Sequence, residues 1–473
     1  MKQPKMERDN IEINKWSLIN IVLFILTVLV TIAPAFSNGY PLLFTDSGTY
    51  LVSGHTGNVP IDRPIIYGLL VRHLSLSYSV WLVILSQSII YNYLVFMVVK
   101  KLVQPKKPFV VLFIIGILMS IFTGVGYYTS LVIADIFTVI SILSLFLLVV
   151  LDKKEKVHIG FISIILLVSI ITHLSHIPLV LAQLFILGIY FLIKKQFKAH
   201  LKRFVFIASL FGGSLLTICL INNSFGAGFI ISRTNNIILA TRYIESGLAS
   251  KFLQKNCGKS DFSPSYNSLC EYKDVFDTWP NAGTYLYDSS SPIYDEECIQ
   301  RGNWTNCWTE KDAEYGDLIS DILSDDELRT DFIALAITGT LKQLITIEQS
   351  PLDYVDLRGI VEKYFPDDLY AYDHSRQARD GSVSFNFKTI LEVLFLYFSI
   401  FLIVLFIRNK NLTHNTLLFL IAIGFSLLFN AAFCATLSNV IPRYQGRIVF
   451  LIPLFMFVLL FQFLNDKKFT LKF

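Results

Sequence analysis

The sequence predicts an all-α polytopic membrane protein of about ten transmembrane helices, with a mainly helical insert between the seventh and the eighth. Of its 473 residues, 53% are hydrophobic and only 16% are charged, whereas soluble domains contain about 25% charged residues. Apolar runs of about 20 residues, the length that crosses a bilayer, recur along the chain. Lys and Arg gather beside alternate ends of these runs. Together these observations exclude an ordinary soluble domain.

The apolar runs divide the chain into three parts. An N-terminal transmembrane module spans 1–222, a polar segment spans 223–386, and C-terminal transmembrane helices lie in 387–473. The first run follows a charged start and lacks a small-residue cleavage site, so we expect it to remain as an anchor. The runs are 17–36, 79–98, 109–126, 131–151, 158–174, 177–193, 204–222, 387–407, 415–437 and 448–464.

The basic residues predict the orientation in the inner (cytoplasmic) membrane of a prokaryote. By the positive-inside rule both termini are cytoplasmic, together with the basic clusters at 100–107, 153–156, 194–203, 408–410 and 467–472. The segment 223–386 then lies outside the cytoplasm, where its acidic residues outnumber its basic ones by about 12. Within it, the stretch 331–347 is apolar but short and is interrupted by Lys342. We therefore expect a buried or interfacial helix there rather than a span.

Four of the six cysteines lie in this outer segment. An even set in an oxidising compartment predicts two disulfides, with the pairing left open. Their spacing contains no close Cys pair of the kind that binds zinc. No Gly-rich phosphate loop occurs, and the basic residues flank the membrane instead of forming a nucleic-acid patch. The disulfide candidates are Cys257, Cys270, Cys298 and Cys307.

Ionisable residues collect at one membrane depth. Each costs about 2.5–3.5 kcal/mol at the bilayer centre, so their presence near spans indicates a function. The predicted topology puts Asp46 and Arg63 in the first outer loop, 37–78, and Asp135 just inside the outer end of the fourth span. If these ionisable residues were distributed at random, some of them would lie at the cytoplasmic ends of the spans. Their position at one depth therefore indicates an active site at the outer leaflet. The other members at this level are His173, His176, Arg443, Tyr444 and Arg447.

The first outer loop is the most informative segment. It is too apolar for a solvated loop and too broken by Gly and Pro for a span. We expect two short helices along the outer surface, the first opened by Asp46-Ser47-Gly48 and the second, amphipathic, from Ile65 to Leu74.

These features resemble the GT-C superfamily of polytopic glycosyltransferases. The resemblance lies in the acid after the first span, the two interfacial helices, the R-P-x-x-Y start of the second helix at Arg63, Asp135 in VIADIF, and the final loop PRYQGRIVFLIPL. Ser47 stands where several subfamilies carry a second acid, and no WWD-like motif occurs, so no subfamily is identified. The resemblance implies a GT-C-like fold and transfer of a sugar from a polyprenyl-phosphate carrier at the outer face of the membrane.

Transfer of a sugar to a hydroxyl requires a base and a stabilised leaving phosphate. We assign the base to Asp46, the alternative being a helix N-cap. Phosphate or carrier binding is assigned to three arginines and a tyrosine: Arg63, Arg443, Tyr444 and Arg447. The alternative for Arg63 is pairing with Asp62 or Asp46. The alternative for Arg443 and Arg447 is snorkelling to the membrane interface.

Asp135 is assigned as a second acidic residue of the substrate groove, the alternative being a structural pair with Arg63 or His173. His173 and His176 are expected to line the groove and bond to sugar or phosphate, and a structural role is the alternative for at least one. Two histidines alone are a weak metal signal. Aromatic residues of the outer segment, Trp308 among them, suit either stacking on sugar rings or the core of a disulfide-tied domain.

The predicted function is that of an inverting membrane glycosyltransferase. It would move a hexose or pentose from a polyprenyl-phosphate-linked donor to an extracytoplasmic glycan, lipid or protein, with membrane lipids as its other partners and no nucleic acid. We assign no cofactor, a divalent cation being the alternative. Two other functions stay open: an O-antigen ligase or polymerase-like enzyme that uses a diphosphate-linked glycan, and a lipid or solute transporter. Transporters usually contain repeated halves, and no internal repeat is found here.

Overall fold

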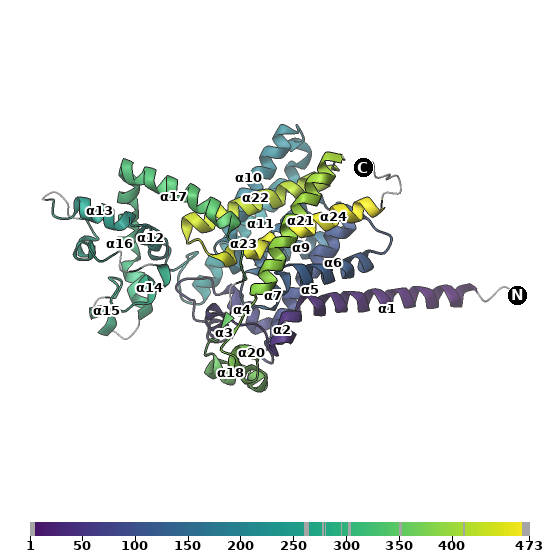
Figure 1. Cartoon of the computed structure of the whole chain (residues 1–473), viewed down its shortest axis with the longest axis horizontal. Helices are drawn as coiled ribbons and strands as arrows, with labels where there is room; N and C mark the ends of the chain where they lie inside the picture. The colour runs from purple at the N-terminus through teal and green to yellow at the C-terminus, as the bar shows by residue number, and fades with distance from the viewer. Residues whose placement is uncertain are drawn as a thin grey trace.

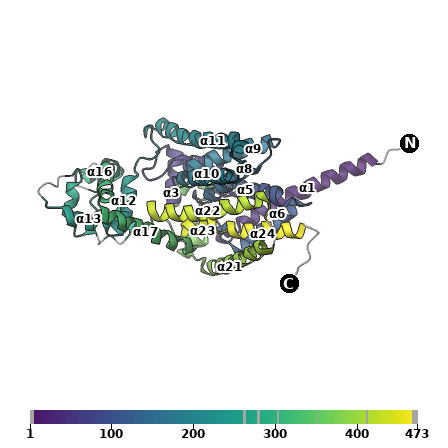
Figure 2. The ribbon, with the colours of Figure 1, turned by 90° about the horizontal axis from the view of Figure 1, so that it is seen from above.

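The computed structural model describes residues 5–259, 264–276, 279, 281–294, 296–300, 304–349, 352–409 and 412–465. These residues are helical apart from connecting segments, one isolated bridge between Leu42 and Leu131, and one antiparallel sheet, in which β1 (Leu352–Asp353) pairs with β2 (Ser382–Val383). Figures 1 and 2 show a helical bundle with a separate group of helices at one end. Helix α1 projects from the opposite end.

The bundle consists of helices from both ends of the sequence. They are α1 (Lys5–Thr31), α2 (Ala33–Asn38), α3 (Thr45–Thr56), α4 (Ile66–Leu74), α5 (Trp81–Val98), the π-helical turn η1 (Val99–Val103), α6 (Pro108–Phe122), α7 (Val125–Ser130), α8 (Ile136–Val150), α9 (Lys156–Thr172), α10 (His176–Ile193), α11 (Phe197–Ser224), α21 (Asn386–Asn409), α22 (His414–Leu437), α23 (Pro442–Val449) and α24 (Leu451–Asn465). The middle of the chain forms α12 (Asn236–Glu245), α13 (Leu248–Asn256), η2 (Asn267–Tyr272), α14 (Ala282–Tyr287), α15 (Glu296–Gln300), α16 (Trp304–Ser324), α17 (Asp326–Ile345), α18 (Arg358–Tyr364), η4 (Pro366–Asp368), α19 (Leu369–Asp373) and α20 (Arg376–Arg379).

The chain is a multi-pass integral membrane protein. In the described part of the chain, six helical segments are long and apolar enough to cross a membrane: Trp81–Val103, His176–Ile193, Phe197–Ser224, Asn386–Arg408, His414–Leu437 and Pro442–Asn465. Four shorter apolar helices are Leu18–Thr31, Pro108–Phe122, Ile136–Val150 and Lys156–Thr172. Together these helices coincide with the apolar runs of the sequence, and six of them have the length of a span.

Helix α8 lies in the centre of the bundle, and all its residues are buried. It begins at Ile136 rather than at 131 because the preceding backbone pairs with the first loop. The amide of Leu42 donates to the Ser130 carbonyl at 2.9 Å, and the amide of Val132 donates to the Leu42 carbonyl at 3.0 Å. This short parallel bridge places Asp135, the residue before α8, beside the first loop.

The two short helices predicted in the first loop are confirmed as α3 and α4. They pack closely where two glycines meet, because a Cβ on Gly54 would clash with the carbonyl group of Gly68. The loop is therefore a compact unit that presents the start of α3 and the turn before α4 to the end of the bundle.

The region 236–345 has its own hydrophobic core and carries the two predicted disulfides. The bonds are Cys257–Cys270 and Cys298–Cys307. The prediction of two disulfides is thus confirmed, and the structure supplies the pairing. Several aromatic residues of the outer segment lie in this core, including Trp279, Tyr285 and Trp308.

The segment 352–383 packs instead into the core of the bundle. The Asp368 carboxylate accepts hydrogen bonds from Ser79 Oγ at 2.8 Å and from the amide of Val80 at 2.7 Å. The Gln377 side chain donates to the Leu43 carbonyl at 2.7 Å and accepts from the Leu43 amide at 3.2 Å. The polar segment 223–386 is therefore divided between the core of the region 236–345 and the core of the bundle. Its last part, 352–383, packs against the first loop.

Candidate functional site

Three aspartates and three arginines form one continuous chain of alternating charge, which we call the ion chain. The successive N···O distances along it are 2.6, 3.0, 3.4, 3.2 and 2.9 Å. The acidic and basic side chains are equal in number. The longest contact, at 3.4 Å, joins Arg443 to Asp46. In order, the members are Asp62, Arg63, Asp46, Arg443, Asp135 and Arg447.

The first loop supplies one half of the ion chain. Asp46 lies in the first turn of α3, and Ser47 Oγ beside it donates to the Val132 carbonyl at 2.9 Å. That bond fixes the start of α3 against the segment that leads to Asp135. Arg63 precedes α4 and is held through Nε and Nη2 by one carboxylate oxygen of Asp62, at 3.1 and 2.6 Å.

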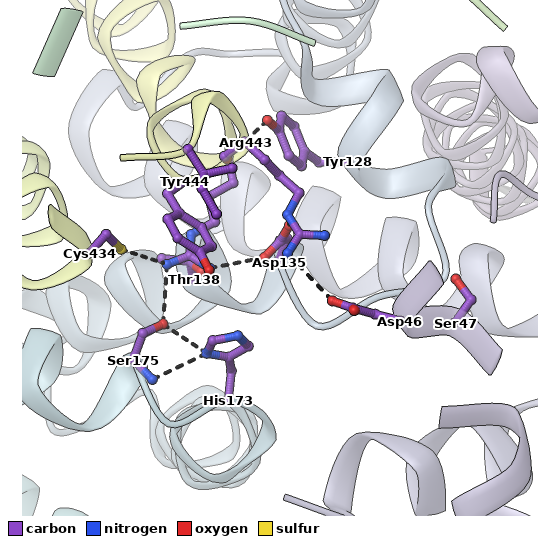
Figure 3. A network of polar contacts seen from close by, with 12 residues as sticks. Asp46, Ser47, Tyr128, Asp135, Thr138, His173, Ser175, Cys434, Arg443 and Tyr444 are labelled. Atoms are coloured by element: carbon purple, nitrogen blue, oxygen red, sulfur yellow. Dashed lines mark hydrogen bonds and ion pairs between the residues drawn. The ribbon is translucent and has the colours of Figure 1, made fainter. Parts of the chain in front are cut away.

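Helix α23 supplies the other two arginines, and Asp135 lies directly before α8. Arg443 and Arg447 are four residues apart, so both side chains leave the same face of the helix. Arg443 reaches between two carboxylates, as Figure 3 shows, with Nε 3.2 Å from Asp135 and Nη2 3.4 Å from Asp46. The Tyr128 hydroxyl donates to the Arg443 carbonyl at 3.2 Å and so ties α23 to α7.

Arg447 is completely buried and is held from several helices. Its Nη1 donates to Asp135 at 2.9 Å, and its Nη2 donates to Ser175 Oγ at 3.1 Å and to Asn430 Oδ1 at 3.0 Å. Nη2 also lies 3.6 Å from the sulfur of Cys434. Such a guanidinium cannot leave its position without breaking bonds to three helices or helix starts, which gives the site a rigid wall.

Aromatic rings cover the guanidinium planes. The Arg443 guanidinium lies 4.4 Å from the ring centre of Phe44, and Arg447 lies 5.1 Å from that of Tyr444. Arg63 lies 5.3 Å from the ring centre of Tyr50. Burial raises the pKa of the Tyr50 phenol despite the nearby Arg63, so this hydroxyl is a neutral hydrogen-bond donor at physiological pH.

The two histidines have different surroundings. His176 is buried, with Nδ1 2.6 Å from the Ser169 carbonyl and Nε2 2.9 Å from Thr138 Oγ1, so both ring nitrogens are engaged inside the protein. His173 lines a cavity, and its Nδ1 contacts Ser175 Oγ at 2.9 Å. Only His173 is therefore placed to contact a bound molecule.

Two cavities meet at the ion chain. The first cavity has a volume of about 610 Å³ and the second about 1020 Å³. Both are bordered by the same five residues: Asp46, Asp62, Arg63, Tyr287 and Trp308. A carboxylate at this junction is open to molecules that arrive from either side.

The two cavities differ in character. In the first cavity the wall of Arg443, Tyr444, Arg447 and His173 faces apolar side chains from α10, α12 and α22, namely Ile177, Pro178, Ile238, Leu239, Phe433 and Leu437. The second cavity has more polar walls, which include Thr45, Thr49, Asn58, Arg233 and Asn306. The first therefore suits an amphiphile with an anionic group, and the second suits a polar molecule.

The disulfide-bearing region contributes the aromatic part of the junction. Tyr287 of α14 and Trp308 of α16 have ring centres 5.8 Å apart. Trp308 is buried and donates from Nε1 to the Tyr294 hydroxyl at 2.9 Å, and its neighbour Cys307 is in a disulfide. Tyr287 is 62% exposed. These rings close the junction from the side opposite the bundle.

Three alternatives from the sequence are wrong. Asp46 is not a helix N-cap, because α3 begins at Thr45 and Phe44 holds the cap position. Arg443 and Arg447 do not snorkel to an interface but are buried against carboxylates. Asp135 does not pair with Arg63 or His173, because its partners are the two arginines of α23, which lie about 300 residues further along the chain.

Sequence reasoning missed several residues that hold the site together. Asn430 and Cys434 lie within an apolar run, and Ser175 sits between the two histidines. An amide inside a predicted span was a usable signal, because a buried amide needs hydrogen-bond partners. Phe44 and Tyr50 carried no signal, since aromatic residues are common in such loops.

The carboxylates of the ion chain are paired with guanidinium groups. Asp46 and Asp135 both face arginines. Among the described residues, no three His, Cys, Asp or Glu side chains are grouped so as to hold an ion.

Comparison of the chain with protein-family profiles, with curated proteins and with solved structures finds no match.

Proposed function

We propose that the protein is an inverting glycosyltransferase of the GT-C type, which moves a sugar from a polyprenyl-phosphate donor to an acceptor hydroxyl outside the cytoplasm. In this proposal all the apolar helices cross the membrane, and the region 236–345 lies at the outer face. One observation carries it: Asp46 lies where an amphiphilic cavity and a polar cavity meet. Group transfer requires two substrates to reach one catalytic group together.

The first cavity is the donor site in this proposal. A lipid-linked sugar phosphate combines an apolar chain with an anionic group, and the first cavity sets an apolar wall beside two arginines. Arg443 Nη1 is buried and has no hydrogen-bond partner among the described residues. A buried donor without a partner costs about 1–3 kcal/mol. In this proposal a shift of the Arg443 side chain toward the donor brings this nitrogen to a phosphate oxygen.

The second cavity holds the acceptor. The acceptor hydroxyl attacks C1 of the sugar while the bond from C1 to the phosphate oxygen breaks. The electron pair of that bond goes to the phosphate, and the hydroxyl proton goes to Asp46. A single displacement of this kind inverts the anomeric centre. Base catalysis contributes about 10²–10⁴-fold to such a step.

The ion chain explains how Asp46 becomes available. Its contact with Arg443 is the longest of the series, at 3.4 Å, and its side chain is partly exposed. A donor phosphate competes with Asp46 for Arg443, because both are anions beside one guanidinium. Phosphate binding would therefore free one carboxylate oxygen for the acceptor proton. Asp135 and Arg447 hold the frame in which Arg443 moves.

An enzyme that uses a diphosphate-linked glycan is the second candidate, because three arginines in one chain also suit two phosphates. The copurified lipid distinguishes the two, since the donors differ in mass.

The test of the base assignment is transfer from a polyprenyl-phosphate sugar by the purified Asp46→Asn protein. We expect a loss of at least about 10²-fold in turnover. The thermal transition should fall less than in Asp135→Asn, because the Asp46 side chain is 25% exposed and that of Asp135 only 3%. The matched control is Asp331→Asn, which breaks a solvent-exposed pair with Lys251 and should keep full activity. Wild-type turnover in Asp46→Asn would overturn the assignment.

A further inference from the structure

Helix α17 has an apolar face that no described part of the chain covers. Four large side chains on it, spaced four residues apart, are between 53% and 80% exposed: Ile333, Ile337, Leu341 and Ile345. Residues at this spacing lie along one side of a helix. We call them the apolar stripe.

The opposite face of α17 is packed, so the helix itself is firmly placed. A Cβ on Gly339 would lie 3.4 Å from the Cβ of Ala435 in α22, which is the contact distance of two closely packed helices. Gln343 is completely buried and bonds to the backbone of Ile441 on both sides, accepting from the amide at 2.9 Å and donating to the carbonyl at 2.9 Å. The apolar stripe is therefore held facing outward.

The exposed surface of α17 changes character along its axis. Its first turns expose polar side chains, among them Asp326, Glu327, Arg329 and Thr330. From Ile333 onward the exposed surface is mainly apolar, over a length of about 18 Å at 1.5 Å per residue. Lys342 is the single charge there, and a lysine stem can extend along apolar surface with its ammonium group in water. This gradient suits a helix that passes from water into a bilayer.

The stripe is continuous with a surface that faces lipid. Figure 1 shows α17 running from the region 236–345 to the bundle beside α22, and the two helices are in contact. Helix α22 is a candidate span, and Leu428 on it is also exposed. An exposed apolar side chain on a span faces acyl chains, so its neighbour at the same level does too.

We propose that the apolar stripe of α17 is seated in the bilayer, so that α17 is an interfacial helix anchoring the region 236–345 to the membrane. Gln343 of this helix hydrogen-bonds to the backbone of Ile441, the residue before α23. The interfacial helix thereby holds in position the helix that carries Arg443 and Arg447. The inference does not depend on the reaction proposed above.

The experiment measures the accessibility of spin labels on the full chain in lipid nanodiscs. Labels are attached to cysteines introduced at Ile333, Ile337, Leu341 and Ile345, with Asp326→Cys and Thr330→Cys as matched controls on the polar start. The parent protein should take up no label, because its free thiols, Cys219 and Cys434, are buried. Power saturation is recorded with oxygen, which concentrates in lipid, and with a water-soluble nickel chelate.

We expect oxygen to be the stronger relaxant at the stripe positions and the nickel chelate to be stronger at both controls. Nickel dominance at all six positions would overturn the proposal, since the stripe would then face water. Low accessibility to both reagents would also overturn it, because a second copy or a partner protein would cover the stripe. The unsubstituted protein gives a second readout: phospholipids with a photoreactive acyl chain should crosslink to 333–345 and not to 326–330.

Discussion

Replacing Asp135 with Asn removes the counter-charge of two buried arginines without changing the shape of the side chain. The exposed fraction of the side chain is 3% for Asp135, 0% for Arg447 and 12% for Arg443, and the two N···O distances are 2.9 and 3.2 Å. Removing one partner of a buried ion pair costs about 3–5 kcal/mol, because the other charge stays buried without compensation. We expect a loss of stability in that range.

The expected change in thermal transition follows from the size of the chain. A change of 1 kcal/mol shifts the transition by about 2–4 °C in proteins of 150–250 residues and by less in larger ones. Asp135→Asn should therefore lower it by about 4–10 °C. The double variant Asp135→Asn with Arg447→Gln should lose less than the sum of the two single losses, by about 1–3 kcal/mol, because it leaves fewer charges unpaired.

The assay is intrinsic tryptophan fluorescence during thermal unfolding in nanodiscs. Arg329→Gln is the control, because Arg329 and Asp326 form an exposed pair of the kind that contributes at most about 1 kcal/mol. A loss in Asp135→Asn no larger than in the control, or full additivity in the double variant, would refute the claim that the ion chain is a buried network.

Three further predictions concern other parts of the structure. Non-reducing peptide mapping should yield Cys257–Cys270 and Cys298–Cys307, and replacing Cys298 and Cys307 together with Ser should cost about 2–5 kcal/mol; any other pairing would contradict the core of the region 236–345. Gln343→Ala leaves the Ile441 amide and carbonyl unpaired, so we expect about 1–3 kcal/mol of destabilisation and reduced turnover, whereas the exposed Lys342→Ala should change neither. The Asp325 side chain caps α17, and its hydrogen bond from Lys255 lowers the pKa of the carboxyl group. An aspartate with a lowered pKa stabilises the folded state at pH values above its ordinary pKa, near 4. That contribution is lost as the pH falls from there through the lowered pKa. Amide exchange at Glu327 and Leu328, corrected for intrinsic rates, should therefore rise in acid in the parent protein and be insensitive to pH in Asp325→Asn.

The membrane class, the helices of the first loop and the presence of two disulfides could be predicted from the sequence, because each rests on local composition. Apolar length determines a span, and Gly and Pro mark helix ends. The set of site residues was also accessible, since the cost of an ionisable group near lipid singles out Asp46, Asp135 and the two arginines of α23.

The partners within the site could not be predicted. Asp135 and Arg447 are joined by packing between helices from opposite ends of the chain, and no local pattern encodes that contact. For the same reason, sequence alone did not show that 352–383 packs on the first loop while 236–345 has its own core. Nor did it indicate that two cavities share Asp46, because a cavity is the space left by all the surrounding helices.

The most direct test of the proposed function is the mass of the lipid that copurifies with the protein, compared with that from Arg443→Gln. We expect a polyprenyl-phosphate sugar from the parent protein and its loss from the variant, because Arg443 lines the first cavity and its guanidinium has a nitrogen, Nη1, with no hydrogen-bond partner among the described residues. Ordinary phospholipids alone from both proteins, or a diphosphate-linked glycan from the parent, would contradict a monophosphate-dependent glycosyltransferase.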